Sequence, residues 1–129
     1  MTKIVLDVGN CNPDHNALTS MLTRSYDVSV LRAHELTDTI QLLSQKPVDL
    51  ILINRKLDID YSDGMDILRE LKQNESFKSI PVMIVTNYAE HQEAAVAEGA
   101  EYGFGKLQFA ESATHERLSR ILNKRPAHD

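Results

Sequence analysis

The sequence predicts an α/β fold in which five parallel strands form one sheet with helices on both of its faces. Short apolar runs alternate along the chain with longer segments whose apolar residues recur every three or four positions, as expected for strands that alternate with amphipathic helices. The run at residues 50–53 is apolar at every position, which is typical of a parallel strand covered on both faces. Right-handed crossovers then give a single, doubly wound sheet.

The five expected strands are recognised by their apolar residues and by the residues that bound them. The first lies in the opening KIVLDV, and the second alternates apolar with polar side chains, as a strand near a sheet edge does. Pro47 and Pro81 stand shortly before the third and fourth apolar runs. The expected strands are residues 4–6, 26–31, 50–53, 82–85 and 102–104.

The expected helices begin or end at residues with known capping preferences. We expect Asn12, Asp63 and Ser112 to cap the first, third and fifth helices, with a proline in the first turn after Asn12. Pro47 and Gly99 are expected to end the second helix and the alanine-rich fourth helix at residues 90–98. The apolar stripes of the other helices are Leu18, Met21 and Leu22; Leu36, Ile40 and Leu43; Ile67, Leu68 and Leu71; and Leu118, Ile121 and Leu122.

Length and composition bound the class of protein. With 129 residues and a hydrophobic content of 42%, we expect one domain over residues 1–129 and no output domain. A net charge of −5 repels a phosphate backbone, so no nucleic acid partner is expected. The chain has no apolar stretch near the roughly 20 residues of a membrane span and no signal-peptide pattern. A cytoplasmic protein with a single, unpaired cysteine is therefore expected.

Candidate site residues follow the strands of the predicted sheet. Ligands of open parallel sheets bind at the carboxyl ends of the strands. The segments to consider are therefore residues 8–12, 54–63, 86–87 and 105–106.

At these positions the chain resembles the receiver domain of bacterial two-component response regulators, the CheY-like family. The resemblance covers nearly the whole chain and rests on KIVLDV, VDLILIN followed by DGMDILRELK, IPVMIVTN and AEGAEYGFGK, in that order. It implies a flavodoxin-like fold with strand order 2-1-3-4-5. It also implies a phosphorylation pocket, in which an aspartate after the third strand takes a phosphoryl group from a histidine kinase. Two acidic residues hold Mg²⁺, and a Thr or Ser and a Lys contact the phosphoryl oxygens.

The nucleophile of that pocket is missing from this chain. Thr86 and Lys106 match the residues that contact the phosphoryl oxygens, but Asn54 stands where the phosphorylated aspartate is implied. An amide oxygen is a poor nucleophile and forms no stable acyl phosphate. We expect the Asn54 amide to hydrogen-bond Lys106 or Thr86 instead and to hold one conformation.

The metal ligands are missing as well. The implied acidic pair falls on Val8 and Gly9 in one register, or on Asn10 and Cys11 in another, and neither register supplies adjacent carboxylates. Because Mg²⁺ prefers charged oxygen ligands, we expect no metal and no cofactor. Cys11 lies near His15, but two such residues do not make a zinc site, and an inert loop thiol is the favoured interpretation.

Three further positions depart from the resemblance. Asn87 occupies a position that is usually small, and Leu107 replaces a proline after the implied Lys, so a trans bond is expected there. The switch aromatic three residues before Lys106 is replaced by Gly103, and it stays open whether its aromatic neighbours take over.

The remaining acidic residues allow several interpretations. Asp7 lies in or at the end of the first strand, where a buried carboxylate needs a partner; Lys106 is one candidate. Asp7 with Asp58 or Asp60 could instead rebuild a metal site from new positions. The string from Asp58 to Gly64 resembles a calcium loop only in part, and an acidic turn is favoured. The loops after the first and third strands each look about two residues longer than usual in the family, and a solvated loop and a ligand or partner surface both stay open.

The sequence therefore predicts a pseudo-receiver, a non-enzymatic signalling or scaffolding module that does not use aspartyl phosphorylation. The resemblance implies a protein partner on the face of the fourth helix, fifth strand and fifth helix, roughly residues 90–106 and 111–125, where a homodimer can also form. The alternative is a receiver that still accepts a phosphoryl group on Asp7, Asp58 or Asp60 with Mg²⁺. A small-molecule binding module that uses the enlarged loops is a third hypothesis.

Overall fold

Strands and helices alternate along the whole described chain, as the sequence predicts. A computed structural model describes residues 2–125. The strands are β1 (Lys3–Val8), β2 (Val28–Ala33), β3 (Leu50–Asn54), β4 (Val82–Val85) and β5 (Glu101–Phe104). The helices are α1 (Asn12–Ser25), α2 (Leu36–Gln45), α3 (Gly64–Gln73), α4 (Ala89–Ala97) and α5 (Ser112–Ser119). Within residues 2–125, no helix is both long and apolar enough to cross a membrane.

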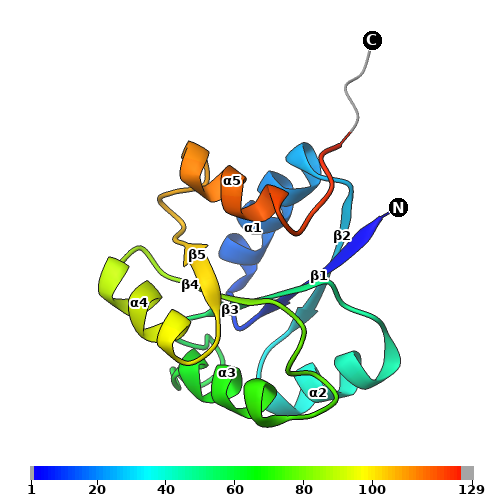
Figure 1. The fold of residues 1–129 in the computed structure, drawn as a ribbon, viewed down its shortest axis with the longest axis vertical. Coiled ribbons are helices and arrows are strands. Elements are labelled where there is room, and N and C mark those ends of the chain that lie inside the picture. Colours follow the sequence, from blue (N-terminus) through cyan, green and yellow to red (C-terminus); the bar gives the residue numbers. More distant parts are fainter. Residues whose placement is uncertain (1, 126–129) are drawn as a thin grey trace.

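The five strands form one parallel sheet in the order β2-β1-β3-β4-β5, which confirms the predicted topology (Figure 1). β1 and β3 are neighbours at its centre. The pairing of β4 with β5 is irregular: Met83 pairs with Glu101 and Val85 with Phe104, with a shift of register between them. Because every strand runs in the same direction, their carboxyl ends and the loops that follow meet at one edge of the sheet.

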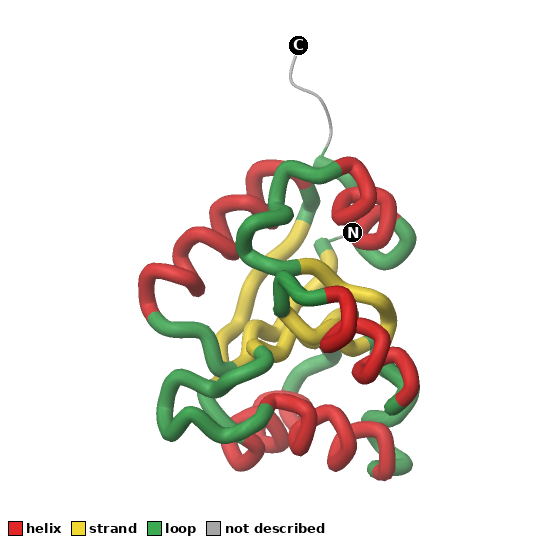
Figure 2. Tube along the Cα trace, turned by 90° about the vertical axis from the view of Figure 1, so that its left-hand side faces the viewer, coloured by secondary structure: helices red, strands yellow, loops and turns green. Residues whose placement is uncertain are grey.

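Helices cover both faces of the sheet, and each covered face has its own apolar core (Figures 1 and 2). Alternate residues of each strand point to opposite faces. Ile51 and Ile53 of β3 pack against α2, α3 and α4, whereas Leu50 and Leu52 pack against α1 and α5. All four side chains are fully buried, which explains why this strand has no polar position before Asn54.

The helix ends agree only in part with the capping predicted from sequence. Asp63 caps α3 as expected, because its side chain accepts a hydrogen bond from the backbone of Met65. The predictions for Asn12 and Ser112 were wrong: Cys11 and Glu111 occupy the N-cap positions, and neither makes a side-chain capping bond. In both cases the helix begins at the residue expected to cap it, so that residue lies inside the first turn.

The second strand begins two residues later than predicted. Tyr26 was expected to open it, but its backbone amide bonds to Leu22, which makes it the residue that ends α1. Its ring is buried and stacks on His115 of α5. A local sequence pattern cannot predict this contact, because His115 lies 89 residues further along the chain.

Candidate functional site

The candidate site lies at the edge of the sheet where the strands end, as expected. It comprises residues 7–15 from the end of β1 into the start of α1, the loop of residues 55–63 after β3, residues 86–88 after β4 and residues 105–108 after β5. Three local arrangements occupy this edge: a buried network around Asp7, an ordered β3–α3 loop, and a rebuilt turn after β5.

Asn54 lies at the end of β3 and turns its amide toward its own loop. Its Nδ2 donates a hydrogen bond to the backbone carbonyl of Lys56 at 2.7 Å. The expectation that it would bond to Lys106 or Thr86 was wrong. The amide group makes this bond because an amide nitrogen can donate, whereas an ionised aspartate can only accept.

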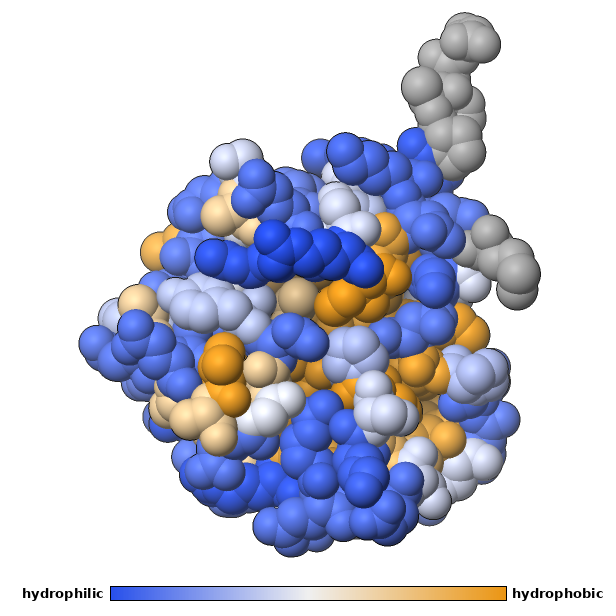
Figure 3. Space-filling view, viewed as in Figure 1, coloured by the Kyte–Doolittle hydropathy of each residue, from blue (hydrophilic) through white to orange (hydrophobic). Residues whose placement is uncertain are grey.

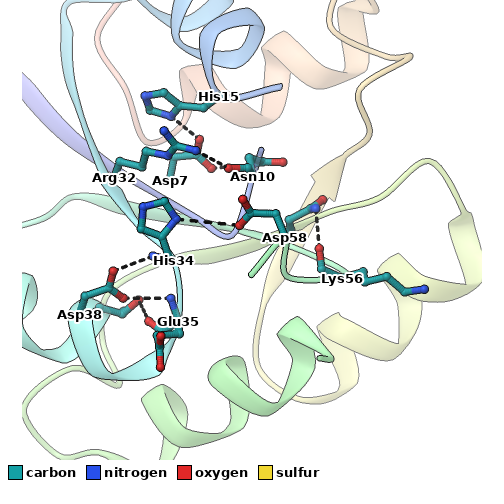
Figure 4. Close-up of polar contacts among 11 residues, drawn as sticks. Asp7, Asn10, His15, Arg32, His34, Glu35, Asp38, Lys56 and Asp58 are labelled. Carbon is teal, nitrogen blue, oxygen red and sulfur yellow. Dashed lines mark hydrogen bonds and ion pairs between the residues drawn. The ribbon is translucent and has the colours of Figure 1, made fainter. Parts of the chain in front are cut away.

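Asp7 is fully buried and is held by polar partners from the β1–α1 segment (Figure 4). Asn10 donates from Nδ2 to Asp7 Oδ1, and His15 Nδ1 lies 2.7 Å from Asp7 Oδ2. Arg32 of β2 donates to the backbone carbonyl of Asn10 at 2.9 Å. A buried carboxylate needs such partners, and here they come from Asn10 and His15. Lys106, proposed from the sequence, is not among them.

Lys106 pairs instead with Asp14 in the first turn of α1. Its Nζ lies 2.7 Å from Asp14 Oδ2, and both side chains are partly exposed. The hydrogen bond from Lys106 holds the pKa of Asp14 below its ordinary value of 3.8, with a smaller contribution from Cys11. Lys106 is therefore paired with a residue of α1 and not with Asp7 of β1.

The β3–α3 loop is folded against the β1–α1 loop. Leu57 is buried, the backbone amide of Asp58 donates to the carbonyl of Gly9 at 3.0 Å, and Leu57 bonds to Ser62 across the loop. Gly9 has a φ of +82°, and a side chain there would collide with Leu57. The sequence therefore needs glycine at position 9 to let the two loops meet.

The acidic residues of this loop are spread rather than gathered. The Asp58 carboxylate lies 3.9 Å from His34, as Figure 4 shows, and Asp60 accepts from the backbone of Ser62. Asp63 caps α3 and pairs with Arg55. Within the described part of the chain, no group of three or more His, Cys, Asp or Glu side chains is arranged to hold a metal ion.

Asn87 shapes the turn after β5. Its Oδ1 accepts a hydrogen bond from the backbone amide of Leu107 at 3.0 Å, and Gln108 Oε1 accepts one from Gly105 at 2.8 Å. The peptide bond after Lys106 is trans, as expected, like every other one in residues 2–125. The large side chain at position 87 is thus used to hold a turn, and it leaves the space beside Thr86 open.

Gln92 is a residue of the site region that sequence reasoning missed. It lies on α4 and is buried, although glutamine is usually exposed. Its Nε2 donates to the carbonyl of Ile84 at 2.9 Å, and its Oε1 accepts from the amide of Gly103 at 2.7 Å. It thereby links α4 with β4 and β5 at the position of the missing switch aromatic. The neighbouring Tyr102 lies under Arg117, with 4.3 Å between guanidinium carbon and ring centre.

A pocket of about 210 Å³ opens beside Asn54, between the ends of β3, β4 and β5. Thr86 lies in it, with its hydroxyl 3.1 Å from His91 Nδ1. Of the sequence-predicted residues, the pocket brings together Asn54, Thr86, Asn87 and Lys106; it does not include Asp7, Asn10, Cys11, Asp58 or Asp60.

The fold and the residues at this edge define the class of CheY-like receiver domains. A model of the response regulator receiver domain matches residues 12–118. The chain belongs to this family. No curated protein sequence matches it.

Solved structures show the same fold at low sequence identity. A putative response regulator from Chloroflexus aurantiacus is 18% identical, with a TM-score of 0.79 and coverage of 94% of this chain and 98% of that one. The chemotaxis response regulator CheY4 of Vibrio cholerae is 16% identical, with a TM-score of 0.73 and coverage of 95% and 100%. The receiver domain of a sensor histidine kinase from Pseudomonas aeruginosa, which has a magnesium ion coordinated in its active-site cleft, is 18% identical, with a TM-score of 0.68 and coverage of 94% of each chain.

Proposed function

We propose that this receiver domain is a protein-interaction module of signalling that works without aspartyl phosphorylation. The observation that carries the proposal is the state of Asn54: the side chain at the end of β3 is an amide, and it is bonded to the carbonyl of Lys56. Phosphoryl transfer to a receiver needs a carboxylate oxygen that attacks phosphorus. Asn54 has none, so the central step has no nucleophile at its usual place.

The residues after β1 do not fit the magnesium ion that such a transfer uses. Mg²⁺ needs carboxylate and water oxygens in a near-octahedral arrangement. The carboxylate of Asp7, near the end of β1, is fully buried, and its two oxygens are bonded to Asn10 and His15. Asn10 and His15 thus bond the carboxylate oxygens that a cation and its waters would otherwise contact.

Charges on the α4–β5–α5 face support a partner surface there. The charged residues that are exposed on α4 and just after it are acidic, whereas the segment after α5 is basic and α5 itself carries charges of both signs. The acidic residues on the α4 side are Glu90, Glu93, Glu98 and Glu101; the α5 side has the basic Arg117, Arg120 and Lys124 and the acidic Glu111 and Glu116. Figure 3 shows apolar surface between the polar side chains on this side of the molecule. A two-fold axis that brings α4 of one copy to the basic segment after α5 of the other would pair opposite charges.

Intact-mass spectrometry tests whether the chain accepts phosphate. The protein is incubated with Mg²⁺ and acetyl phosphate, beside an Asn54→Asp variant and a receiver domain with a complete acidic pocket as donor control. We expect phosphate on the control and none on the natural chain. Phosphate on the natural chain would overturn the proposal, and its position would test the alternative acceptors Asp7, Asp58 and Asp60.

The Asn54→Asp variant separates two causes of inactivity. If it gains phosphate, the missing nucleophile alone blocks the reaction. If it stays unmodified, the lack of metal ligands after β1 blocks it as well. We expect the second result, because the substitution leaves Asp7 bonded to Asn10 and His15.

A further inference from the structure

A second pocket, of about 320 Å³, lies away from the candidate site, between α1 and the segment that leads into α5. Both helices cover the same face of the sheet (Figure 1). Residues 17–25 of α1 supply one wall of this pocket and residues 109–115 supply the other. It shares no lining residue with the pocket beside Asn54.

The aromatic wall of this α1–α5 pocket is fixed by contacts behind it. The ring of Phe109 packs edge-on against the buried Phe104, with 6.0 Å between the ring centres. The ring of His115 stacks on the buried Tyr26. His115 Nε2 donates to the carbonyl of Phe109 at 2.7 Å, and its Nδ1 lies 2.6 Å from the hydroxyl of Tyr26. Both ring nitrogens are thus engaged, so His115 contributes apolar ring surface to the pocket and no free polar group.

The α1 wall carries polar side chains that have no partner of their own. Among the described residues that line the pocket, Arg24 is the only one of the charged types Asp, Glu, Lys and Arg. It makes no ion pair or hydrogen bond with another described residue, and neither do the hydroxyls of Ser20 and Ser25. Thr23 shows the usual alternative for a helical hydroxyl, because it bonds back to the carbonyl of Thr19 at 2.8 Å. One guanidinium and two hydroxyls therefore remain available to a ligand.

The volume and the lining of the pocket define a class of ligand. At 320 Å³, the space is just above the roughly 300 Å³ at which small-molecule sites begin, and such sites combine apolar walls with a few polar groups. The small side chains of Ala17 and Ala110 leave room for an apolar ring or a branched chain. A single guanidinium favours a monoanion, and a carboxylate fits two of its parallel N–H donors.

We propose that the α1–α5 pocket reversibly binds a small apolar monocarboxylate. Its carboxylate pairs with Arg24, and its ring or branched chain lies against Met21 and Phe109. The hydroxyls of Ser20 and Ser25 supply further donors to the carboxylate oxygens. Binding forms no covalent bond. It uses neither the end of β3 nor the α4–β5–α5 face, so its failure in an experiment would leave the proposed function unaffected.

NMR titration of the ¹⁵N-labelled chain with cyclohexanecarboxylate tests the proposal. Two comparison compounds are titrated at the same ionic strength: cyclohexanecarboxamide, which keeps the ring without the charge, and acetate, which keeps the charge without the ring. We expect saturable shifts centred on residues 17–25 and 109–115, and binding of each comparison compound that is weaker by about tenfold or more. Absence of saturable shifts, shifts centred elsewhere, or equal affinity for the acid and its amide would each overturn the proposal.

Two variants and a control decide whether this pocket is responsible. Arg24→Gln should weaken binding of cyclohexanecarboxylate by about tenfold and leave the carboxamide unchanged, because only a charge-assisted bond is lost. Ala17→Leu should weaken both, because the larger side chain fills the pocket; position 17 is exposed on α1 and leucine favours helix, so the fold should persist. Lys46→Gln, at an exposed site after α2, should change neither affinity.

The variants can also refute the proposal. Binding of the acid to Arg24→Gln as tightly as to the natural chain would exclude the guanidinium as its partner. Unchanged binding to Ala17→Leu, with NMR signals outside the pocket confirming the fold, would exclude the pocket itself. A loss in Lys46→Gln as large as in Arg24→Gln would reduce the effect to the net charge of the chain.

Discussion

The side chain of Gln92 and the backbone of Gly103 are joined by a buried hydrogen bond of 2.7 Å that links α4 to β5. An ideal Cβ at position 103 would lie 2.6 Å from the carbonyl oxygen of Ile84. The two features belong together: glycine leaves the space, and the amide of Gln92 uses it. The position at which the resemblance implied a switch aromatic is therefore occupied by a glycine that donates its backbone amide to Gln92.

Gln92→Ala should lower the free energy of unfolding by about 1–3 kcal/mol, because it leaves the Gly103 amide and the Ile84 carbonyl without their buried partner. Urea unfolding followed by circular dichroism measures the change. Gln41→Ala, at an exposed site of α2, is the matched control and should change stability little. Equal losses in the two variants would contradict the structural role of Gln92.

His15→Phe should destabilise the fold by about 3 kcal/mol, since removing one partner leaves a buried carboxylate uncompensated. Asp7 is fully buried, and its Oδ2 lies 2.7 Å from His15. The double variant Asp7→Asn, His15→Phe should regain part of the loss, which urea unfolding of all three proteins would reveal. His34→Phe is the control, because His34 is 43% exposed and 3.9 Å from Asp58. A loss as large in the control would refute this account of the buried pair.

The ion pair between Asp14 and Lys106 should make a small contribution to stability that disappears in acid. Its bond to Lys106 lowers the pKa of Asp14 below 3.8, so the unfolded chain binds a proton first as pH falls. The contribution is therefore present above 3.8 and is lost as pH falls through the lower folded value. Both groups are partly exposed, so Lys106→Gln should cost less than about 1 kcal/mol at neutral pH.

Urea unfolding of Lys106→Gln and of the natural chain across the acid range checks that sign. The difference in free energy of unfolding between the two proteins should become smaller as the pH falls. Lys46→Gln should track the natural chain at every pH. A difference in free energy of unfolding that grows as the pH falls would contradict the ion pair between Asp14 and Lys106.

Association through the α4–β5–α5 face should depend on the acidic residues of α4 and the basic residues that follow α5. Arg120→Glu should weaken self-association in sedimentation velocity, and adding Glu93→Lys should restore part of it. If copies associate through these charges, raising the salt concentration should also weaken that association, because exposed charges are screened. Equal association of all these proteins would exclude the face as a charge-paired interface between copies.

The sequence was sufficient for the sheet but not for the contacts at its edge. The apolar runs placed all five strands, with β4 assigned to its observed residues, because burial on both faces leaves a signal in every strand residue. Asp63 was also predictable, since its capping bond reaches only two residues along the chain. The partners of Asp7 and Lys106 were not, because both depend on where the start of α1 docks after β1.

Gln92 shows why such contacts escape a pattern. A glutamine in a helix is expected to be exposed, and its burial follows from the absence of a side chain at Gly103, 11 residues further on. The glutamine at position 92 and the glycine at position 103 can each be read from the sequence, but only the fold shows that they are in contact. Leu57 is similar: the sequence left open whether its loop is solvated, and in the fold this residue is buried against Gly9.

The irregular pairing between β4 and β5 bears on whether a second chain can extend this edge of the sheet. A regular edge strand offers unpaired backbone groups to which a neighbouring chain can add its own strand. β5 is a short edge strand of four residues, it begins with the exposed Glu101, and its register with β4 shifts midway. Such an edge is a poor template for a continuous intermolecular sheet. Assembly on this side should therefore stay discrete and reversible, made by helix side chains, and should not grow into fibres.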